Sequence, residues 1–493
     1  MNYKDAIKKV FEESRKTVGK FGKKELYEFY EIDTKPFTKD ELKEIEKKVD
    51  AVSDEYVIIF GSSSSFWKEE NKNVQRVMFI VGKNKEDAEN KYFSFEELRK
   101  KDHRYLGPKL DIFHFEEDII GPGLPLMHPK GAYIRRRLIE LMRTVNDQLK
   151  CDEVWTPHLS KTVLWHISGH YDKYNDKMFL FELDGDEFGL KPMNCPLHIM
   201  IYKFKPRSYR ELPIRFSEFA TVYRKEQSGE LHGLTRVWSL TQDDHHFYVK
   251  LEDIKSEVKK IITAVMKTYE TLGFKYKAAL STRPEKFIGS IETWNRAEKE
   301  LKEILDELNI EYEIEEGEGA FYGPKVDFEV EDNMKRKWQL ATIQLDFNLP
   351  ERFQMEYMDK DGNLKRPIIV HFAILGSIER FIGILLENYG GRLPTWVNPL
   401  PIAIIPVADR HIEKAEEIAN KLNVKSIILE EGTVQNRVRL AEEQQIKYIC
   451  IIGDKEVESD TIAVRTNRNV ETIGTNEFIE RINKEAKLPK IEI

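Results

Sequence analysis

The stretch FATVYRKEQSGELHGLTRVWSLTQDDHHF, at positions 219–247, decides the architecture of the largest part of this chain. Two apolar runs flank a loop of charged, glycine and serine residues, which predicts a β-hairpin whose loop carries function. Arg224 and Glu226 are two residues apart, so an extended strand would place them on one face. The arginine could hold a phosphate with its planar fork while the carboxylate accepts from an amine. A cross-strand ion pair on the surface is the alternative interpretation.

Three potential metal ligands lie within and around this hairpin. Cys195 stands in LKPMNCPLH, His246 ends TQDDHH, and His371 lies in the apolar run IIVHFAILG. One cysteine and two histidines would leave a position of tetrahedral zinc open for a substrate. Their separations of 51 and 125 residues form no local pattern, so buried packing roles remain the alternative on spacing alone. A second pair, His166 and His170, has helical spacing but lacks a nearby acid and is interrupted by glycine.

A third segment, GSIERFIGILLENYGG at 376–391, predicts an apolar helix that follows a strand. Glu379 and Arg380 stand near the start of this helix. An arginine beside free backbone amides makes an anion pocket that suits polyphosphate. A capping segment with a surface arginine is the alternative interpretation.

Upstream of the hairpin, apolar residues recur at three- and four-residue steps and predict a helix with one apolar face. These residues are Ile134, Leu138, Leu141, Met142, Val145 and Leu149. The helix leads into EVWTPHL, which predicts a short strand closed by Pro157. A helix, strand and proline in this order suit a sheet edge or an interface, although ordinary core packing explains the stripe equally well.

The composition describes a globular chain with 493 residues, enough for about three domains. Its net charge of −8 argues against a protein that coats nucleic acid nonspecifically, yet it leaves room for a local basic face. No apolar run approaches the roughly 18 residues of a membrane span, and no secretory signal is visible. We therefore expect a cytoplasmic protein without membrane contact. Three scattered cysteines are too few for a disulfide framework.

Changes in pattern divide the chain into three parts of an α+β fold class. Residues 1–100 combine charged helical segments with two β-rich runs, YVIIFGSSS and VQRVMFIVG, and predict a small α+β domain. Residues 101–397 form the largest domain. Residues 398–493 alternate buried strands with amphipathic helices at βαβ spacing and predict a compact α/β domain.

Taken together, these segments resemble the class II aminoacyl-tRNA synthetases, and among them the threonyl-tRNA synthetases, over roughly residues 101–493. The helix, strand and Pro157 look like class II motif 1, YRKE with SGELHGLTR looks like motif 2, and GSIERF looks like motif 3. MNCP, TQDDHH, EGEGAFYGPKVDF, WQLATIQLDF and VHFAILGSIERF point to the threonine member. The resemblance implies an antiparallel catalytic sheet followed by a C-terminal α/β anticodon-binding domain.

The resemblance also implies that Cys195, His246 and His371 bind zinc, whose open positions take the amino and hydroxyl groups of L-threonine. Valine is nearly isosteric with threonine but lacks the hydroxyl. A metal-bound hydroxyl would therefore reject valine far better than an apolar pocket could. By the same carry-over, Asp244 accepts the proton of the substrate hydroxyl.

Further implied roles concern ATP, the amino acid and the acceptor end of tRNA. Gln242 and Tyr322 would fix the amino acid. Arg224 would hold the carboxylate and the α-phosphate, Arg380 the γ-phosphate, and Glu226 would lie near the adenine amine. Arg236, Gln339 and Gln344 would line the nucleotide and the acceptor end, and Met193 would lie near the terminal adenosine. The carboxylate of threonine would attack the α-phosphorus of ATP, and arginines with Mg²⁺ would stabilise the phosphate charge.

The remaining implications concern tRNA, assembly and editing. Glu456 and Arg465 in GDKEVESDTIAVR are the candidates for reading anticodon bases of tRNA(Thr), and the motif 1 helix implies a homodimer. Many family members hydrolyse seryl-tRNA in a front domain, whose bacterial form needs a His and Cys zinc site. Residues 1–100 contain neither residue type. We therefore expect no editing in cis and a separate editing protein acting in trans.

The sequence departs from the family pattern at RVWSL, where an Arg-Gly pair is more common, and at His245, which replaces a small residue beside His246.

Two other functions stay open. One is a paralogue without catalysis that acts as a regulator or RNA-binding protein, and the presence of Arg224 and Arg380 weighs against it. The other is a ligase for serine or proline, against which the three candidate zinc ligands and Asp244 weigh.

Overall fold

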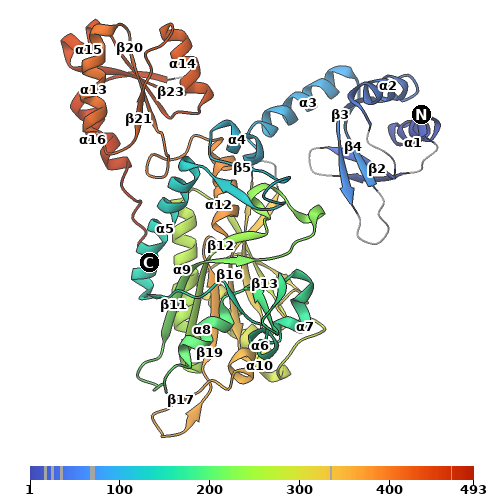
Figure 1. Ribbon diagram of the computed structural model, residues 1–493, viewed down its shortest axis with the longest axis vertical. Helices are drawn as coiled ribbons and strands as arrows, with labels where there is room; N and C mark the ends of the chain where they lie inside the picture. The colour runs from blue at the N-terminus through green and yellow to red at the C-terminus, as the bar shows by residue number, and fades with distance from the viewer. Residues whose placement is uncertain (16–18, 24–26, 34–36, 67–72, 333–335, 468) are drawn as a thin grey trace. The chain divides into compact units, whose positions relative to one another are not determined.

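A computed structural model of the chain describes residues 1–15, 19–23, 27–33, 37–66, 73–332, 336–467 and 469–493 (Figure 1). These residues form two compact units. The first contains Met1–Tyr105, Gln227–Leu231 and Asp332–Arg336. The second contains the other described residues. Within the described part of the chain, no helix combines the length and the apolar character that a membrane crossing requires.

The first unit is built on a four-stranded antiparallel sheet with the order β1-β2-β4-β3. Its elements are α1 (Tyr3–Arg15), β1 (Lys20–Lys23), β2 (Glu28–Asp33), α2 (Lys39–Asp50), β3 (Tyr56–Phe66), β4 (Asn73–Gly82) and α3 (Lys85–Arg99). Phe11 of α1 and Val49 of α2 pack with Tyr30 and Phe79 of the sheet in one buried core. The helix α2 begins at a capping box, in which Thr38 and Glu41 satisfy each other's backbone amides.

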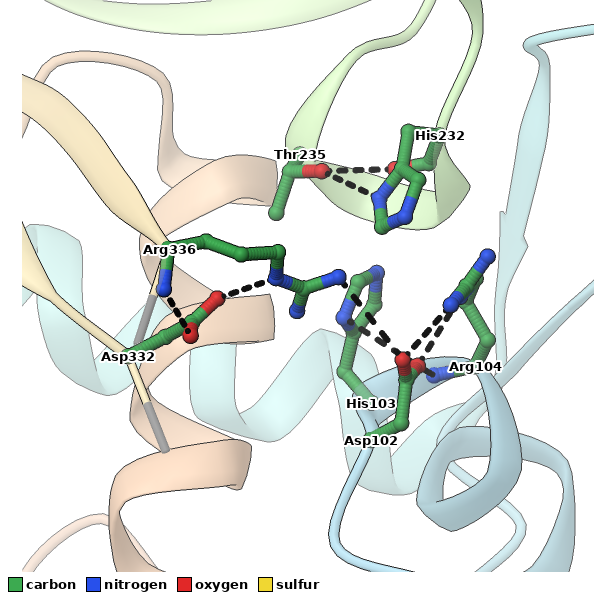
Figure 2. A network of polar contacts seen from close by, with 7 residues as sticks. All are labelled: Asp102, His103, Arg104, His232, Thr235, Asp332 and Arg336. Atoms are coloured by element: carbon green, nitrogen blue, oxygen red, sulfur yellow. Dashed lines mark hydrogen bonds and ion pairs between the residues drawn. The ribbon is translucent and has the colours of Figure 1, made fainter. Parts of the chain in front are cut away.

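A buried carboxylate organises the end of this unit (Figure 2). Asp102 accepts two hydrogen bonds from the Arg104 guanidinium, at 2.9 and 2.7 Å, and lies 3.9 Å from Arg336. Arg336 in turn donates to Asp332 at 2.6 Å. Burial alone would raise the pKa of Asp102, but the hydrogen bonds and charge of Arg104 hold it well below its usual value. Asp332 and Arg336 are thereby tied to the first unit.

An eight-stranded sheet forms the framework of the second unit (Figure 1). In spatial order its strands are β14 (Tyr312–Glu315), β13 (Tyr276–Ser281), β15 (Lys325–Glu331), β16 (Lys337–Asp346), β19 (Ile368–Ala373), β12 (Ser239–Val249), β11 (Ile214–Tyr223) and β7 (Asp152–Glu153). All neighbours are antiparallel except β14 with β13 and β7 with β11. The predicted hairpin is confirmed as β11 and β12, which pair from Ile214 with Tyr248 to Tyr223 with Ser239.

Long helices cover one face of this sheet. They are α5 (Pro129–Leu149), α9 (Ile254–Thr271), α10 (Ile291–Glu307) and α12 (Ile378–Tyr389). The apolar stripe predicted for α5 is confirmed, because all six of its residues are buried in the main core. The strand predicted to close at Pro157 is shorter than expected, since β7 ends at Glu153. Residue 154 still donates a backbone hydrogen bond to Ser217, after which the chain leaves the sheet edge.

Shorter elements surround the sheet. They are α4 (His103–Lys109), β5 (Phe113–Phe115), β6 (Pro125–Met127), β8 (Leu159–Lys161), α6 (Val163–Ser168), α7 (His170–Tyr174), β9 (Leu180–Leu183), β10 (Asp186–Leu190), α8 (Cys195–Tyr202), α11 (Asn348–Arg352), β17 (Tyr357–Met358) and β18 (Leu364–Lys365). Side chains alternate along β12, so Phe247 and Val249 belong to the core under the long helices. Tyr248 belongs to a second core that contains Cys195 of α8.

The C-terminal part of the second unit is a five-stranded α/β sheet with the order β21-β20-β22-β23-β24. Its elements are β20 (Ile402–Pro406), α13 (Ile412–Lys421), β21 (Ser426–Ile428), α14 (Val434–Glu443), β22 (Tyr448–Ile452), α15 (Asp454–Ser459), β23 (Thr461–Thr466), β24 (Asn469–Gly474) and α16 (Thr475–Glu485). The last residues run back along α5 (Figure 1), where the Gln148 amide donates to the carbonyl of Ile491 at 2.7 Å.

Candidate active site

Strand register brings the candidate metal ligands together. His246 on β12 is paired directly with His371 on β19, and directly paired residues of neighbouring strands place their side chains next to each other. Cys195 is the first residue of α8, which covers the same sheet face. All three residues are buried, and one potential ligand atom from each lies within 4.8 Å of the others. The fold thus brings together three side chains that lie far apart in the sequence.

The donor set and its surroundings fit zinc. One thiolate and two imidazoles are ligands that zinc favours, and each histidine uses its other ring nitrogen in a hydrogen bond. His246 Nδ1 lies 2.8 Å from His198 Nδ1, and His371 Nε2 lies 3.0 Å from Asp346 Oδ2. Burial raises the pKa of the Cys195 thiol and lowers that of His246. Binding of a divalent cation would release the thiol proton, and the charge of the cation would stabilise the resulting buried thiolate.

Sequence reasoning missed the residues that support these ligands. His198 and Glu218 form a buried chain behind His246, with His198 Nε2 at 2.9 Å from Glu218 Oε2. A local signal for His198 existed, because it follows Cys195 by three residues on the same helix and so shares its face. Glu218 lies on β11, and a single acid within an apolar strand gave no such signal.

The side chains expected to hold an amino acid lie beside the candidate metal ligands. Gln242, Asp244 and His246 alternate along β12 and so project from one face. Asp244 accepts a 2.7 Å hydrogen bond from Asn194, and burial raises the pKa of its carboxyl group. Tyr322 donates a 2.5 Å hydrogen bond to Gln344, and its ring centroid is 5.7 Å from that of His371.

The intervening residues of β12 face the long helices. Asp243 accepts from the backbone amides of Ile374 and Leu375, both at 3.1 Å, where β19 leads into α12. His245 stacks on Phe372 with centroids 4.3 Å apart, and its Nε2 is 2.8 Å from Asn146 Oδ1 on α5. His245 is therefore a contact between the sheet and α5 and does not enter the face that carries the candidate metal ligands.

Three arginines create an excess of positive charge near the start of α12. The Arg380 guanidinium donates to the carbonyls of Thr235 and Gln339, at 2.8 and 2.9 Å. Burial and the charges of Arg224 and Arg236 lower the pKa of Arg380 to about 10. A polyanion bound here would relieve the mutual repulsion of these cations.

Glu226 corrects one expectation from the sequence. Because β11 ends at Tyr223, Arg224 and Glu226 lie in the loop and do not share the face of an extended strand. Glu226 is buried, yet it pairs across the loop with Arg236, whose side chain is 40% exposed, so the ion pair given as the alternative is present in part. Its carboxylate accepts from Arg236 at 3.1 Å and from Lys177 at 3.2 Å.

Gln339 and Met193 are two further candidates from the sequence. The exposed Gln339 side chain donates a 2.5 Å hydrogen bond to Asp327 on the neighbouring strand, while its backbone carbonyl serves Arg380. Met193 packs against the core that contains Cys195.

The histidine pair with helical spacing is divided between two helices. His166 belongs to α6 and His170 to α7, with Gly169 between them in the left-handed conformation at φ 79°. His166 is exposed and stacks on Tyr171, whereas His170 is buried. Neither belongs to a potential metal cluster in the described part of the chain.

The two anticodon candidates lie in the C-terminal sheet domain. Glu456 accepts a 2.9 Å hydrogen bond from the amide of Gly453 at the start of α15. Arg465 on β23 forms a 2.8 Å ion pair with Glu442 of α14.

Comparison with family models matches two segments. Residues 179–389 match the tRNA synthetase class II core domain (G, H, P, S and T), and residues 401–485 match an anticodon binding domain. The chain is 44% identical to the threonine–tRNA ligase catalytic subunit of Metallosphaera sedula, over 84% of this chain and 78% of that protein. It is 45% identical to the subunit of the same name from Saccharolobus solfataricus, over 86% and 79% of the two chains.

A similar solved structure is that of the RNA binding domain of threonyl-tRNA synthetase from Cryptosporidium parvum. It superposes with a TM-score of 0.74 at 36% identity and covers 79% of this chain and 99% of that chain.

Proposed function

The chain belongs to the threonine–tRNA ligases of class II, and on this premise we propose that it selects L-threonine through a zinc ion before charging tRNA(Thr). The observation that carries the proposal is the convergence of Cys195, His246 and His371 beside Asp244. These residues would hold the ion, which supplies coordination for the amino and hydroxyl groups of the substrate. Asp244 accepts the hydroxyl proton, while Tyr322 and Gln242 orient the amino acid.

Selection against valine follows from the chemistry of this donor set. Valine lacks the hydroxyl group, so a site built for two substrate ligands would be left with an unmatched position and an unpaired Asp244. An apolar pocket, which selects a substrate by its size and shape alone, would discriminate poorly between the nearly isosteric side chains of threonine and valine.

Adenylate formation is assigned to the arginine cluster. ATP with Mg²⁺ would bring negative charge to the place where burial and like charges already lower the pKa of Arg380. Arg224 aligns the threonine carboxylate with the α-phosphate, Arg380 holds the γ-phosphate, and Glu226 accepts from the adenine amine. Arg236, Gln339, Gln344 and Met193 are assigned to the nucleotide and the acceptor end of tRNA. Catalysis is then chiefly alignment and electrostatic stabilisation.

We assign tRNA binding and assembly to different parts of the chain. Residues 101–397 would carry catalysis, and residues 398–493 would read the anticodon through Glu456 and Arg465. The α5 helix would carry the homodimer contact. Residues 1–100 have neither histidine nor cysteine, and the relatives are named catalytic subunits, which supports the proposal that a separate protein edits seryl-tRNA.

Pyrophosphate exchange with zinc-loaded and metal-stripped protein tests the function. Threonine should drive exchange only in the loaded protein, valine should fail, and serine should be activated because it retains the hydroxyl group. Equal exchange with threonine and valine would contradict selection by zinc. Absence of exchange in fully loaded protein would favour the paralogue without catalysis.

A further inference from the structure

A chain of buried polar side chains extends behind His246 and ends in a carboxylate. The Nδ1 atoms of His198 and His246 are 2.8 Å apart, and His198 Nε2 is 2.9 Å from Glu218 Oε2. His198 has no exposed surface and Glu218 is 4% exposed. His198 comes from α8 and Glu218 from β11, so two elements of the core hold the chain in place.

The direction of these hydrogen bonds follows from the chemistry of each group. An ionised carboxylate can only accept, so His198 donates to Glu218 through Nε2. With its hydrogen on Nε2, the His198 imidazole accepts through Nδ1, and the bond between the two rings requires that His246 donates through its own Nδ1. The lone pair of His246 consequently resides on Nε2.

Several groups keep Glu218 in the ionised state that this order requires. The backbone amide and hydroxyl of Thr156 donate to its two oxygens at 2.8 and 2.9 Å, and the Lys191 ammonium lies 3.7 Å away. Burial alone would raise the pKa of Glu218. The hydrogen bond from His198, the charge of Lys191 and the Thr156 amide together lower it below its usual value.

We propose that His198 and Glu218 are positioning residues that fix the tautomer of His246 with Nε2 ready to bind zinc. The inference rests on the proposed zinc site and extends it. His371 is fixed differently, because its Nε2 bonds directly to Asp346 at 3.0 Å. The two histidines therefore present different nitrogens, Nε2 of His246 and Nδ1 of His371. Outer partners of this kind change metal affinity by about 10- to 100-fold.

Glu218→Gln is the sharpest test because it preserves shape and changes the order of donors and acceptors. The Thr156 amide and the Lys191 ammonium both face Oε1 of Glu218, so a glutamine keeps its carbonyl oxygen there and turns its NH2 group toward His198. This NH2 group donates to Nε2, which moves the His198 hydrogen to Nδ1 and obliges His246 to carry its hydrogen on Nε2. We expect zinc to bind about 10- to 100-fold more weakly, as measured by competition with a chromophoric chelator. Threonine-dependent exchange should recover when zinc is raised to saturation.

His198→Leu removes both hydrogen bonds and should weaken zinc binding to a similar extent. Tyr248→Phe is the matched control, because its buried hydroxyl has no hydrogen-bond partner among the described residues and its ring packs in the same core as Cys195. If His198→Leu fails to fold, Glu218→Gln remains as the test. An unchanged melting temperature of the metal-free Glu218→Gln protein would show that its weaker zinc binding comes from lost positioning and not from lost structure.

The outcomes distinguish this inference from the proposed function. A parent chain that binds zinc, with Glu218→Gln binding it equally tightly, would overturn the inference and leave zinc selection intact. Equal weakening in Tyr248→Phe would also overturn it. A parent chain that binds no zinc would contradict the proposed selection and the inference together.

Discussion

Cys195 is a candidate zinc ligand whose thiol pKa is set by its buried surroundings. Its thiol is buried at the start of α8, and burial raises its pKa, so the free thiol has little tendency to ionise by itself. A bound cation would reverse this preference by stabilising the thiolate.

Cys195→Ser should lose zinc and threonine-dependent pyrophosphate exchange while the protein stays folded. The hydroxyl is a poorer zinc ligand than the thiolate, and we expect more than about 100-fold weaker zinc binding. Metal content and exchange are the measurements, and Cys151→Ser is the matched control, since Cys151 is only half-buried and lies outside the ligand cluster. Full exchange by a zinc-free Cys195→Ser protein would refute the assignment.

Among the elements, α5 has contacts in three directions. Its apolar stripe enters the main core, Asn146 bonds to His245 beside the candidate ligands, and Gln148 holds the C-terminal residues. Arg137 adds hydrogen bonds to the carbonyls of Trp396 and Ala486, at 2.7 and 2.8 Å. The helix thus connects the catalytic sheet with both ends of the C-terminal domain.

Leu138→Ala should destabilise the protein by about 2–5 kcal/mol, because the side chain is fully buried on α5 and its removal leaves a cavity. Urea unfolding followed by tryptophan fluorescence measures the loss. Lys299→Ala on α10 is a suitable control, since this lysine is exposed and its ion pair with Glu303 spans 3.8 Å, so its effect should stay within about 0.5 kcal/mol. Similar losses in both variants would contradict the role assigned to the α5 stripe.

At the scale of the whole molecule, activation and tRNA recognition are assigned to separate sheets. The Arg465 ion pair with Glu442 uses one end of its guanidinium, and its buried Nε has no partner among the described residues. The Arg465 side chain is 37% exposed, so the part of its guanidinium that Glu442 leaves open could donate to a base edge presented by single-stranded RNA.

Arg465→Ala should therefore lower kcat/KM for tRNA by about 10- to 100-fold, the effect of losing charge-assisted hydrogen bonds. Pyrophosphate exchange should stay unchanged. Arg439→Ala removes a surface arginine that pairs with Glu443 on α14 of the same domain, and it should leave both steps unaffected. Equal damage to both steps in Arg465→Ala would show that the residue has been assigned to the wrong site.

Editing gives a second prediction at this scale. Purified protein mixed with seryl-tRNA(Thr) should hydrolyse the ester no faster than buffer does, because residues 1–100 offer neither a histidine nor a cysteine for the His and Cys chemistry of the bacterial editing site. Rapid release of serine would refute this expectation. Deletion of residues 1–100 then locates any hydrolysis that is observed.

The amino-acid pattern was enough to predict the hairpin of β11 and β12, the apolar face of α5 and the α/β character of the C-terminal domain. Each of these depends on periodicity over neighbouring residues, which reports burial directly. Motif order also indicated the family. The end of β11 was less predictable. Glu226 leaves the strand and pairs with Arg236, and the charge of Arg224 acts on Arg380, whose position depends on a distant segment.

Which side chains contact one another across the site depends on the folded chain. The register of β12 against β19 places His246 opposite His371, and it is fixed by packing between segments far apart in the chain. The same packing puts Glu218 behind His198 and turns His245 toward α5. Local patterns carry no information about such pairings, because the energy of a buried hydrogen bond depends on partners that the chain brings together only on folding.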